Sequence, residues 1–111
     1  MSAAYQVVYW RDIPAQVKIR HDGGRVARPL SNRFQAAIDE AAMRSGAADT
    51  DSYLEEWRTS DWQARDGEPE ALATALVAEI EATYRPERLN ALVANDGREV
   101  GLTPPSAVGG R

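Results

Sequence analysis

Two runs of strand-forming residues flank a short loop near the start of the chain. Residues 5–10 form an almost unbroken apolar run, and the residues after the loop at 11–14 alternate between apolar and polar up to residue 20. Val, Ile, Tyr and Trp favour strands, and Pro14 cannot donate a hydrogen bond to a sheet. The pattern predicts a hairpin with an inner first strand beside a half-exposed second strand.

A tight turn and a third strand are expected after this hairpin. Asp22, Gly23 and Gly24 are typical of such a turn, because glycine readily adopts the positive φ that it requires. Residues 25–28 then return as the third strand, and Pro29 ends it. So small a sheet needs cover on one face, since it is not stable alone.

The remainder of the chain has the periodicity of helices. A first helix is expected after the capping residue Ser31 and ends at Gly46, a second spans residues 52–57, and two more begin at Pro69 and near Pro86. The segment 59–67 is polar except for Trp62, and its pattern fits a loop or a fourth short strand. We favour a strand around Trp62.

These patterns predict an α+β fold, in which a short antiparallel sheet of three or four strands is covered by three or four helices. We expect one compact domain over residues 1–97 and a disordered tail over 98–111, which is rich in Gly, Pro and small residues. The core residues expected on the sheet are Val7, Val8, Ile13, Val17 and Ile19. Those expected to cover it in the same core are Phe34, Ile38, Leu54, Trp57, Leu76 and Ile80.

Composition excludes several kinds of catalytic site. The chain has no cysteine, which removes thiolate nucleophiles and cysteine-based metal sites, and its one histidine, His21, can form neither a two-histidine metal site nor a serine triad. Adjacent carboxylates such as Glu55 and Glu56 point apart on a helix, and we interpret them as solvated. No catalytic residue, metal ligand or cofactor is predicted.

The charge of the chain opposes binding to nucleic acid. Its formal net charge is −4, from 17 acidic and 13 basic residues. Basic residues nevertheless predominate between Arg11 and Arg33, and we interpret them as solvated strand residues that protect a sheet edge. Neither a signal peptide nor a membrane span is indicated, so a cytoplasmic protein is expected.

The densest mixture of aromatic and charged residues lies at the end of the first strand. Arg11 can hold an anion, and Trp10 can stack on a flat ligand. For Trp10, Arg11 and Asp12 a binding role and a structural role both remain open, whereas core packing is favoured for Trp57. Arg11 is expected to face solvent. The candidate partner- or ligand-binding residues are Trp10, Arg11, Asp12, Pro14, Gln16 and Trp57.

Three segments resemble a small bacterial family of "virulence factor" domain proteins. They are YWRDIPAQV at residues 9–17, RFQAAIDEAAM at 33–43 and DTDSYLEEWR at 49–58, in the order and spacing of the family. The family has no established activity or catalytic residue to carry over. The resemblance implies a stand-alone cytosolic domain, encoded in some bacteria near methylenetetrahydrofolate reductase and corrinoid methyltransferase genes. It thereby suggests an accessory subunit in one-carbon metabolism.

Two functions are compatible with these features. The first is a non-catalytic accessory domain that docks on a protein partner, such as a folate- or corrinoid-dependent enzyme. The alternative is a small-molecule binder or minor enzyme, in which Arg11 holds a flat anionic metabolite and Trp10 or Trp57 stacks on its ring. A pocket of a few hundred cubic ångströms near Arg11 would favour the alternative. The oligomeric state is left open.

Overall fold

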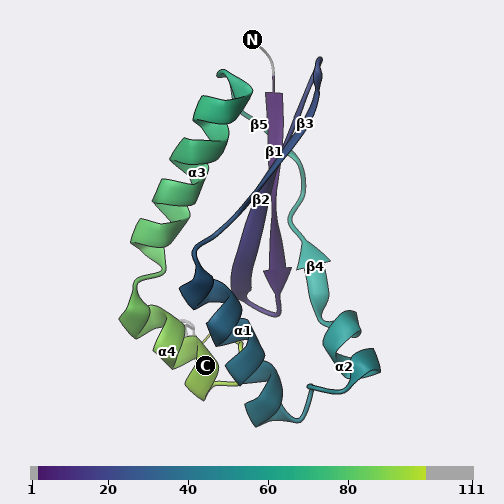
Figure 1. Ribbon diagram of the computed structural model, residues 1–111, viewed down its shortest axis with the longest axis vertical. Helices are drawn as coiled ribbons and strands as arrows, with labels where there is room; N and C mark the ends of the chain where they lie inside the picture. The colour runs from purple at the N-terminus through teal and green to yellow at the C-terminus, as the bar shows by residue number, and fades with distance from the viewer. Residues whose placement is uncertain (1–2, 100–111) are drawn as a thin grey trace, which may run out of the picture.

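A five-stranded antiparallel sheet lies at the centre of the structure, a computed structural model that describes residues 3–99 (Figure 1). Its strands are β1 (Ala3–Trp10), β2 (Ile13–His21), β3 (Gly24–Pro29), β4 (Trp57–Thr59) and β5 (Gln63–Ala64). The order is β3-β2-β1-β4, and β5 also pairs with β1. β1 is therefore the inner strand, as predicted.

Four helices complete the described part of the chain and confirm the α+β fold. They are α1 (Asn32–Ser45), α2 (Thr50–Glu55), α3 (Pro69–Thr83) and α4 (Pro86–Ala94). Helix α3 runs along the sheet and packs on β2 and β3, whereas α1, α2 and α4 gather near the end of the sheet where β1 leads into β2 (Figure 1). The helices thus pack against the sheet in two regions, one along β2 and β3 and the other at the end of the β1–β2 hairpin.

The turn between β1 and β2 is shorter than the predicted loop. Only Arg11 and Asp12 connect the strands, because Ile13 and Pro14 already pair with β1. A register shift beside Pro14 leaves Ala15 without a direct partner in β1, and such a bulge tolerates a proline. Arg11 adopts a φ of 52°, which is unusual for a residue other than glycine.

The buried side chains form two clusters rather than the predicted single core. One lies between the sheet and α3 and includes Val7, Val17, Ile19, Leu72 and Leu76. The other lies at the hairpin end and includes Trp10, Ile13, Phe34, Ile38 and Leu92. The partly buried Val77 and Ile80 of α3 pack against both clusters and connect them.

Two expected core residues lie outside these clusters. Leu54 is 59% exposed, because Tyr53 directs the short α2 inward and the next residue of a helix points to a different side. Val8 is only half-buried, since successive residues of a strand face opposite sides and Val7 takes the buried side.

The segment after Asp49 differs from its prediction in detail. Helix α2 ends at Glu55, and Trp57 belongs to β4 instead, where it pairs with Trp10. The segment 59–67 does contain a short strand, β5 at Gln63–Ala64, but it begins one residue after Trp62, and Trp62 itself lies in neither β4 nor β5. Pairing of both flanking strands with β1 fixes the path of this connection.

Helix ends follow local chemistry, with one exception. Gly46 ends α1 with a φ of 77°, and Pro69 opens α3 after the cap Glu68. The backbone N–H of Ala71 donates to the Glu68 carboxylate at 2.8 Å, which lowers the pKa of Glu68. Ser31 occupies the N-cap position of α1, as predicted, but its side chain makes no capping hydrogen bond and its hydroxyl donates to Glu81 Oε1 at 2.9 Å.

The last described residues contact the hairpin. The backbone N–H of Glu99 donates to Asp12 Oδ2 at 2.7 Å, and Arg88 on α4 forms an ion pair with Glu99. Arg98 and Glu99 belong to the segment predicted as a disordered tail, and its other residues, 100–111, lie outside the described residues.

Candidate functional site

Arg11, the central residue of the predicted site, is engaged within the molecule. Its Nε atom lies 3.2 Å from Glu56 Oε1, as an ion pair without an aligned hydrogen bond, and its Nη1 donates to the carbonyl of Asp96 at 2.7 Å. Arg98 Nη2 approaches the same Glu56 oxygen at 3.5 Å. Only 11% of the Arg11 side chain is exposed, so the prediction that it faces solvent is wrong. Glu56 and Asp96 therefore hold the Arg11 side chain inside the structure, beside the hairpin turn to which Arg11 belongs.

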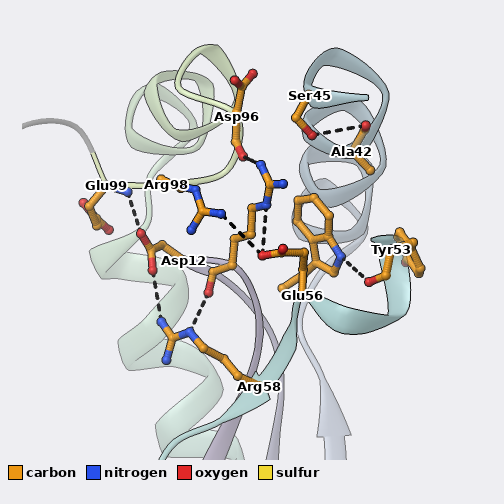
Figure 2. A network of polar contacts seen from close by, with 11 residues as sticks. Asp12, Ala42, Ser45, Tyr53, Glu56, Arg58, Asp96, Arg98 and Glu99 are labelled. Atoms are coloured by element: carbon orange, nitrogen blue, oxygen red, sulfur yellow. Dashed lines mark hydrogen bonds and ion pairs between the residues drawn. The ribbon is translucent and has the colours of Figure 1, made fainter. Parts of the chain in front are cut away.

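Asp12 is held in the same network. Arg58 Nη2 lies 3.1 Å from one carboxylate oxygen, and the N–H of Glu99 donates to the other. The backbone N–H of Asp12 donates to the carbonyl of Gly97 at 2.8 Å. The carboxylate of Asp12 therefore joins β4 and the end of the described chain to the hairpin turn (Figure 2).

Trp10 and Trp57 lie beside this network as packing residues. Trp10 is fully buried, and its Nε1 donates to the carbonyl of Tyr53 at 2.9 Å. The Tyr53 ring stacks on Trp10 and meets Trp57 edge-on, with 5.8 Å between ring centroids in both pairs. A β-carbon at Gly97 would lie 3.1 Å from the Trp10 ring, so the chain passes close to the indole. These contacts favour the structural role of Trp10.

The other two predicted site residues lie on β2. Pro14 is fully buried, and Gln16 is half-buried in register with Val8 on β1 and Pro29 on β3. The structure thus brings Trp10, Arg11, Asp12 and Trp57 together, but it places Gln16 farther along the sheet.

A cavity of ≈ 260 Å³ lies between β1 and α3. Tyr5, Tyr9 and Tyr84 line it together with apolar side chains and with the polar side chains of Ser60, Gln63, Glu79 and Thr83. Arg11, Trp10 and Trp57 do not line it. Burial raises the pKa of Tyr9 and of Tyr84, so both phenols are neutral at physiological pH. The hydroxyl of Tyr5 donates to Gln63 at 3.1 Å. The cavity can accept a small ring and offers it neutral hydroxyl groups.

The opposite side of the sheet carries a set of side chains that sequence reasoning did not single out as a site. We call it the open face and define it as Gln6, Lys18, Arg20, Arg25, Ala27 and Trp62. Val17 and Ile19 of β2 turn toward the buried cluster, so the alternate residues Lys18 and Arg20 turn away from it. None of the six side chains belongs to either buried cluster.

Trp62 contacts Arg20 and lies beside the other cations of the open face. The guanidinium carbon of Arg20 lies 4.4 Å from the centroid of the Trp62 ring, in a cation–π contact. Beside it, a hollow of ≈ 210 Å³ is lined by Lys18, Arg25, Val26, Ala27 and Trp62. Strand alternation in the sequence indicated the outward direction of Lys18 and Arg20. No sequence signal indicated that Trp62 would reach them.

The cations of the open face differ from the other basic residues of the sheet. Within residues 3–99, Lys18, Arg20 and Arg25 form no ion pair, whereas Arg28 on the other side of β3 pairs with Glu70 of α3. Arg20 and Arg25 are directly opposite each other on neighbouring strands. The open face is therefore a positively charged patch with an aromatic ring beside it.

The described residues hold neither a metal-binding cluster nor a membrane-spanning helix. Among residues 3–99, no group of three or more His, Asp and Glu side chains is placed to hold a metal ion. The same residues include no helix that is both long and apolar enough to cross a membrane.

In the cavity between β1 and α3, the carboxylate of Glu79 forms an ion pair with Arg65 at 2.7 Å.

Comparison with known proteins identifies the family of the chain. A family model described as "Virulence factor" matches residues 8–93, which extend from β1 into α4 and include the three segments of the resemblance. Searches of the curated proteins and of the solved structures each gave no match. The matched range includes most of the open face but ends before Asp96 and Arg98. Because the match covers well over half of its length, the chain belongs to the virulence factor family.

Proposed function

We propose that this protein is a non-catalytic accessory domain that binds a partner protein through the open face. The contact between Trp62 and Arg20 carries the proposal, because it places an aromatic ring and a guanidinium group together at the surface. Aromatic and arginine side chains are the usual anchors of protein interfaces. Sequence reasoning assigned the same role to the hairpin turn, where Arg11 and Asp12 are instead engaged in internal contacts.

The family resemblance suggests which partners to test first. Its association with genes for folate- and corrinoid-dependent enzymes supports a role in one-carbon metabolism, and we propose such an enzyme as the partner, in the cytoplasm. This part of the proposal depends on the resemblance alone and not on the geometry of the open face.

Photo-crosslinking in the native host tests the binding role. A photoreactive amino acid at Ala27, an exposed residue of the open face, should join the protein to one partner of defined mass. The same amino acid at Ala78, an exposed residue of α3, should give no such product. Mass spectrometry of the product at position 27 identifies the partner.

The two positions distinguish a specific surface from general reactivity. Equal products from positions 27 and 78 would contradict docking through the open face. If neither position gives a product in cells that express the proposed enzyme, the accessory role fails.

The cavity between β1 and α3 supports a second function, binding of a flat metabolite among Tyr5, Tyr9 and Tyr84. A ligand that binds the native state raises its melting temperature. We expect folates at about millimolar concentration to give such a rise if this function is correct. Thr83→Trp should abolish the rise, since the new ring would occupy the cavity from the exposed end of α3. No rise with folates or nucleotides would reject this function.

A further inference from the structure

We propose that the open face binds an acidic, extended segment of the partner, which adds to the sheet as a strand beside β3. This inference rests on the proposed function and deepens it, because it names the chemistry of the bound segment. Three features carry it: the charge of the face, the free edge of β3 and the hollow beside Trp62.

The charge of the face calls for a negatively charged partner. Arg20 and Arg25 are cross-strand partners, and like charges directly opposite each other destabilise a sheet. Lys18 lies two residues from Arg20 on the same side of β2 and adds a third positive charge. No carboxylate within residues 3–99 forms an ion pair with any of them. Carboxylates from a partner would neutralise this repulsion.

The edge of the sheet favours an extended segment. β3 is the last strand of the order β3-β2-β1-β4, and no described strand pairs with its outer side. A free edge presents backbone N–H and C=O groups with which a peptide can pair. Alternate side chains of that peptide would lie on the same side of the sheet as Arg25 and Ala27.

The hollow beside Trp62 provides room for these side chains. Its volume is ≈ 210 Å³, and its lining includes Lys18 on β2 together with Arg25 and Ala27 on β3. A carboxylate of the bound segment placed in this hollow would lie close to both Lys18 and Arg25. Trp62 also lines the hollow, and an aromatic ring beside such an ion pair would reduce its exposure to water.

A nucleic acid is disfavoured by the rest of the molecule. The chain has a net charge of −4, which repels a long phosphate backbone. Asp22 in the turn between β2 and β3 and Asp61 beside Trp62 are exposed acidic residues at the border of the face. A short segment with a few carboxylates fits the patch, whereas a continuous polyanion would extend past it onto acidic surface.

Binding of a synthetic peptide to the full chain tests the inference. The probe is a fluorescein-labelled peptide as long as β3, in which glutamate and valine alternate, and the matched probe carries glutamine in place of glutamate. The glutamate peptide should bind with a dissociation constant below about 1 mM by fluorescence anisotropy, and added salt should weaken it. The glutamine peptide should bind at least about tenfold more weakly.

Paired variants locate the binding surface. Arg20→Gln with Arg25→Gln should weaken the glutamate peptide by at least about tenfold. The control, Arg44→Gln with Arg85→Gln, removes the same charge from other exposed positions and should change binding less than about twofold. All four side chains are exposed, so both variants should fold, and circular dichroism checks this. Equal losses in the two variants would overturn the site.

Further outcomes separate this inference from the proposed function. Protection of β3 amides from hydrogen exchange on adding the peptide supports strand addition, and protection confined to other elements overturns it. If position 27 crosslinks to a partner but the glutamate peptide does not bind, the acidic segment is wrong and the accessory role stands. Tighter binding of a single-stranded oligonucleotide than of the glutamate peptide also overturns the inference.

Discussion

Replacing Ile38 with alanine should lower the free energy of unfolding by about 2–5 kcal/mol. Ile38 lies on α1 and is fully buried in the cluster that contains Trp10, Phe34 and Leu92. The truncation loses the transfer free energy of the removed methyl and methylene groups and leaves a cavity. Small domains are stable by about 5–15 kcal/mol, so Ile38→Ala should come close to unfolding the protein. Urea denaturation followed by circular dichroism measures the loss.

Leu54→Ala provides the matched control for this variant. It removes the same number of carbon atoms, but Leu54 is 59% exposed and should contribute less than about 0.5 kcal/mol. Equal destabilisation by the two substitutions would contradict the arrangement of α1 and α2 around the hairpin.

Arg11→Ala should cost about 2–3 kcal/mol, in contrast to the loss below about 1 kcal/mol expected of a solvent-facing residue. The substitution leaves the Glu56 carboxylate without its nearest cation and the Asp96 carbonyl without its donor. Arg85→Ala is the control, because that side chain is 73% exposed and approaches Glu87 only at 3.8 Å. Its expected loss is below about 0.5 kcal/mol.

A double-mutant cycle shows whether the ion pair is responsible. If Arg11 stabilises the fold through Glu56, the effects of Arg11→Ala and Glu56→Gln should be non-additive by at least about 0.5 kcal/mol. A small loss from Arg11→Ala together with additive effects would return Arg11 to the candidate binding residues.

The parts of the fold that depend on local sequence could be predicted. The hairpin follows from alternation around a turn, and the end of α1 follows from Gly46, whose conformation glycine adopts easily. The buried side of α2 could not be predicted, because six residues do not show whether Tyr53 or Leu54 faces the core. Likewise, Trp57 has the local pattern of a helix, and pairing with distant Trp10 places it in a strand.

The candidate site was harder to predict for a related reason. A sequence shows that Trp10, Arg11 and Asp12 combine aromatic and charged groups, but it does not show whether their partners are internal or external. The internal partners of Arg11, Glu56 and Asp96, are remote in the sequence. Conversely, the alternation of β2 predicted that Lys18 and Arg20 face outward, whereas only the folded chain brings Trp62 beside them.

The contact between Asp12 and Glu99 has a consequence for the order of folding. The two residues are 87 positions apart, so this hydrogen bond closes one of the longest loops in the described chain. The hairpin forms from neighbours and can appear within microseconds, whereas closing so long a loop costs more chain entropy, so we expect it to form after the intervening helices have packed. A contact made after the rate-limiting step does not speed folding, but it slows unfolding. We therefore expect loss of the network at the turn to speed unfolding more than it slows folding, which stopped-flow measurement of both rates checks.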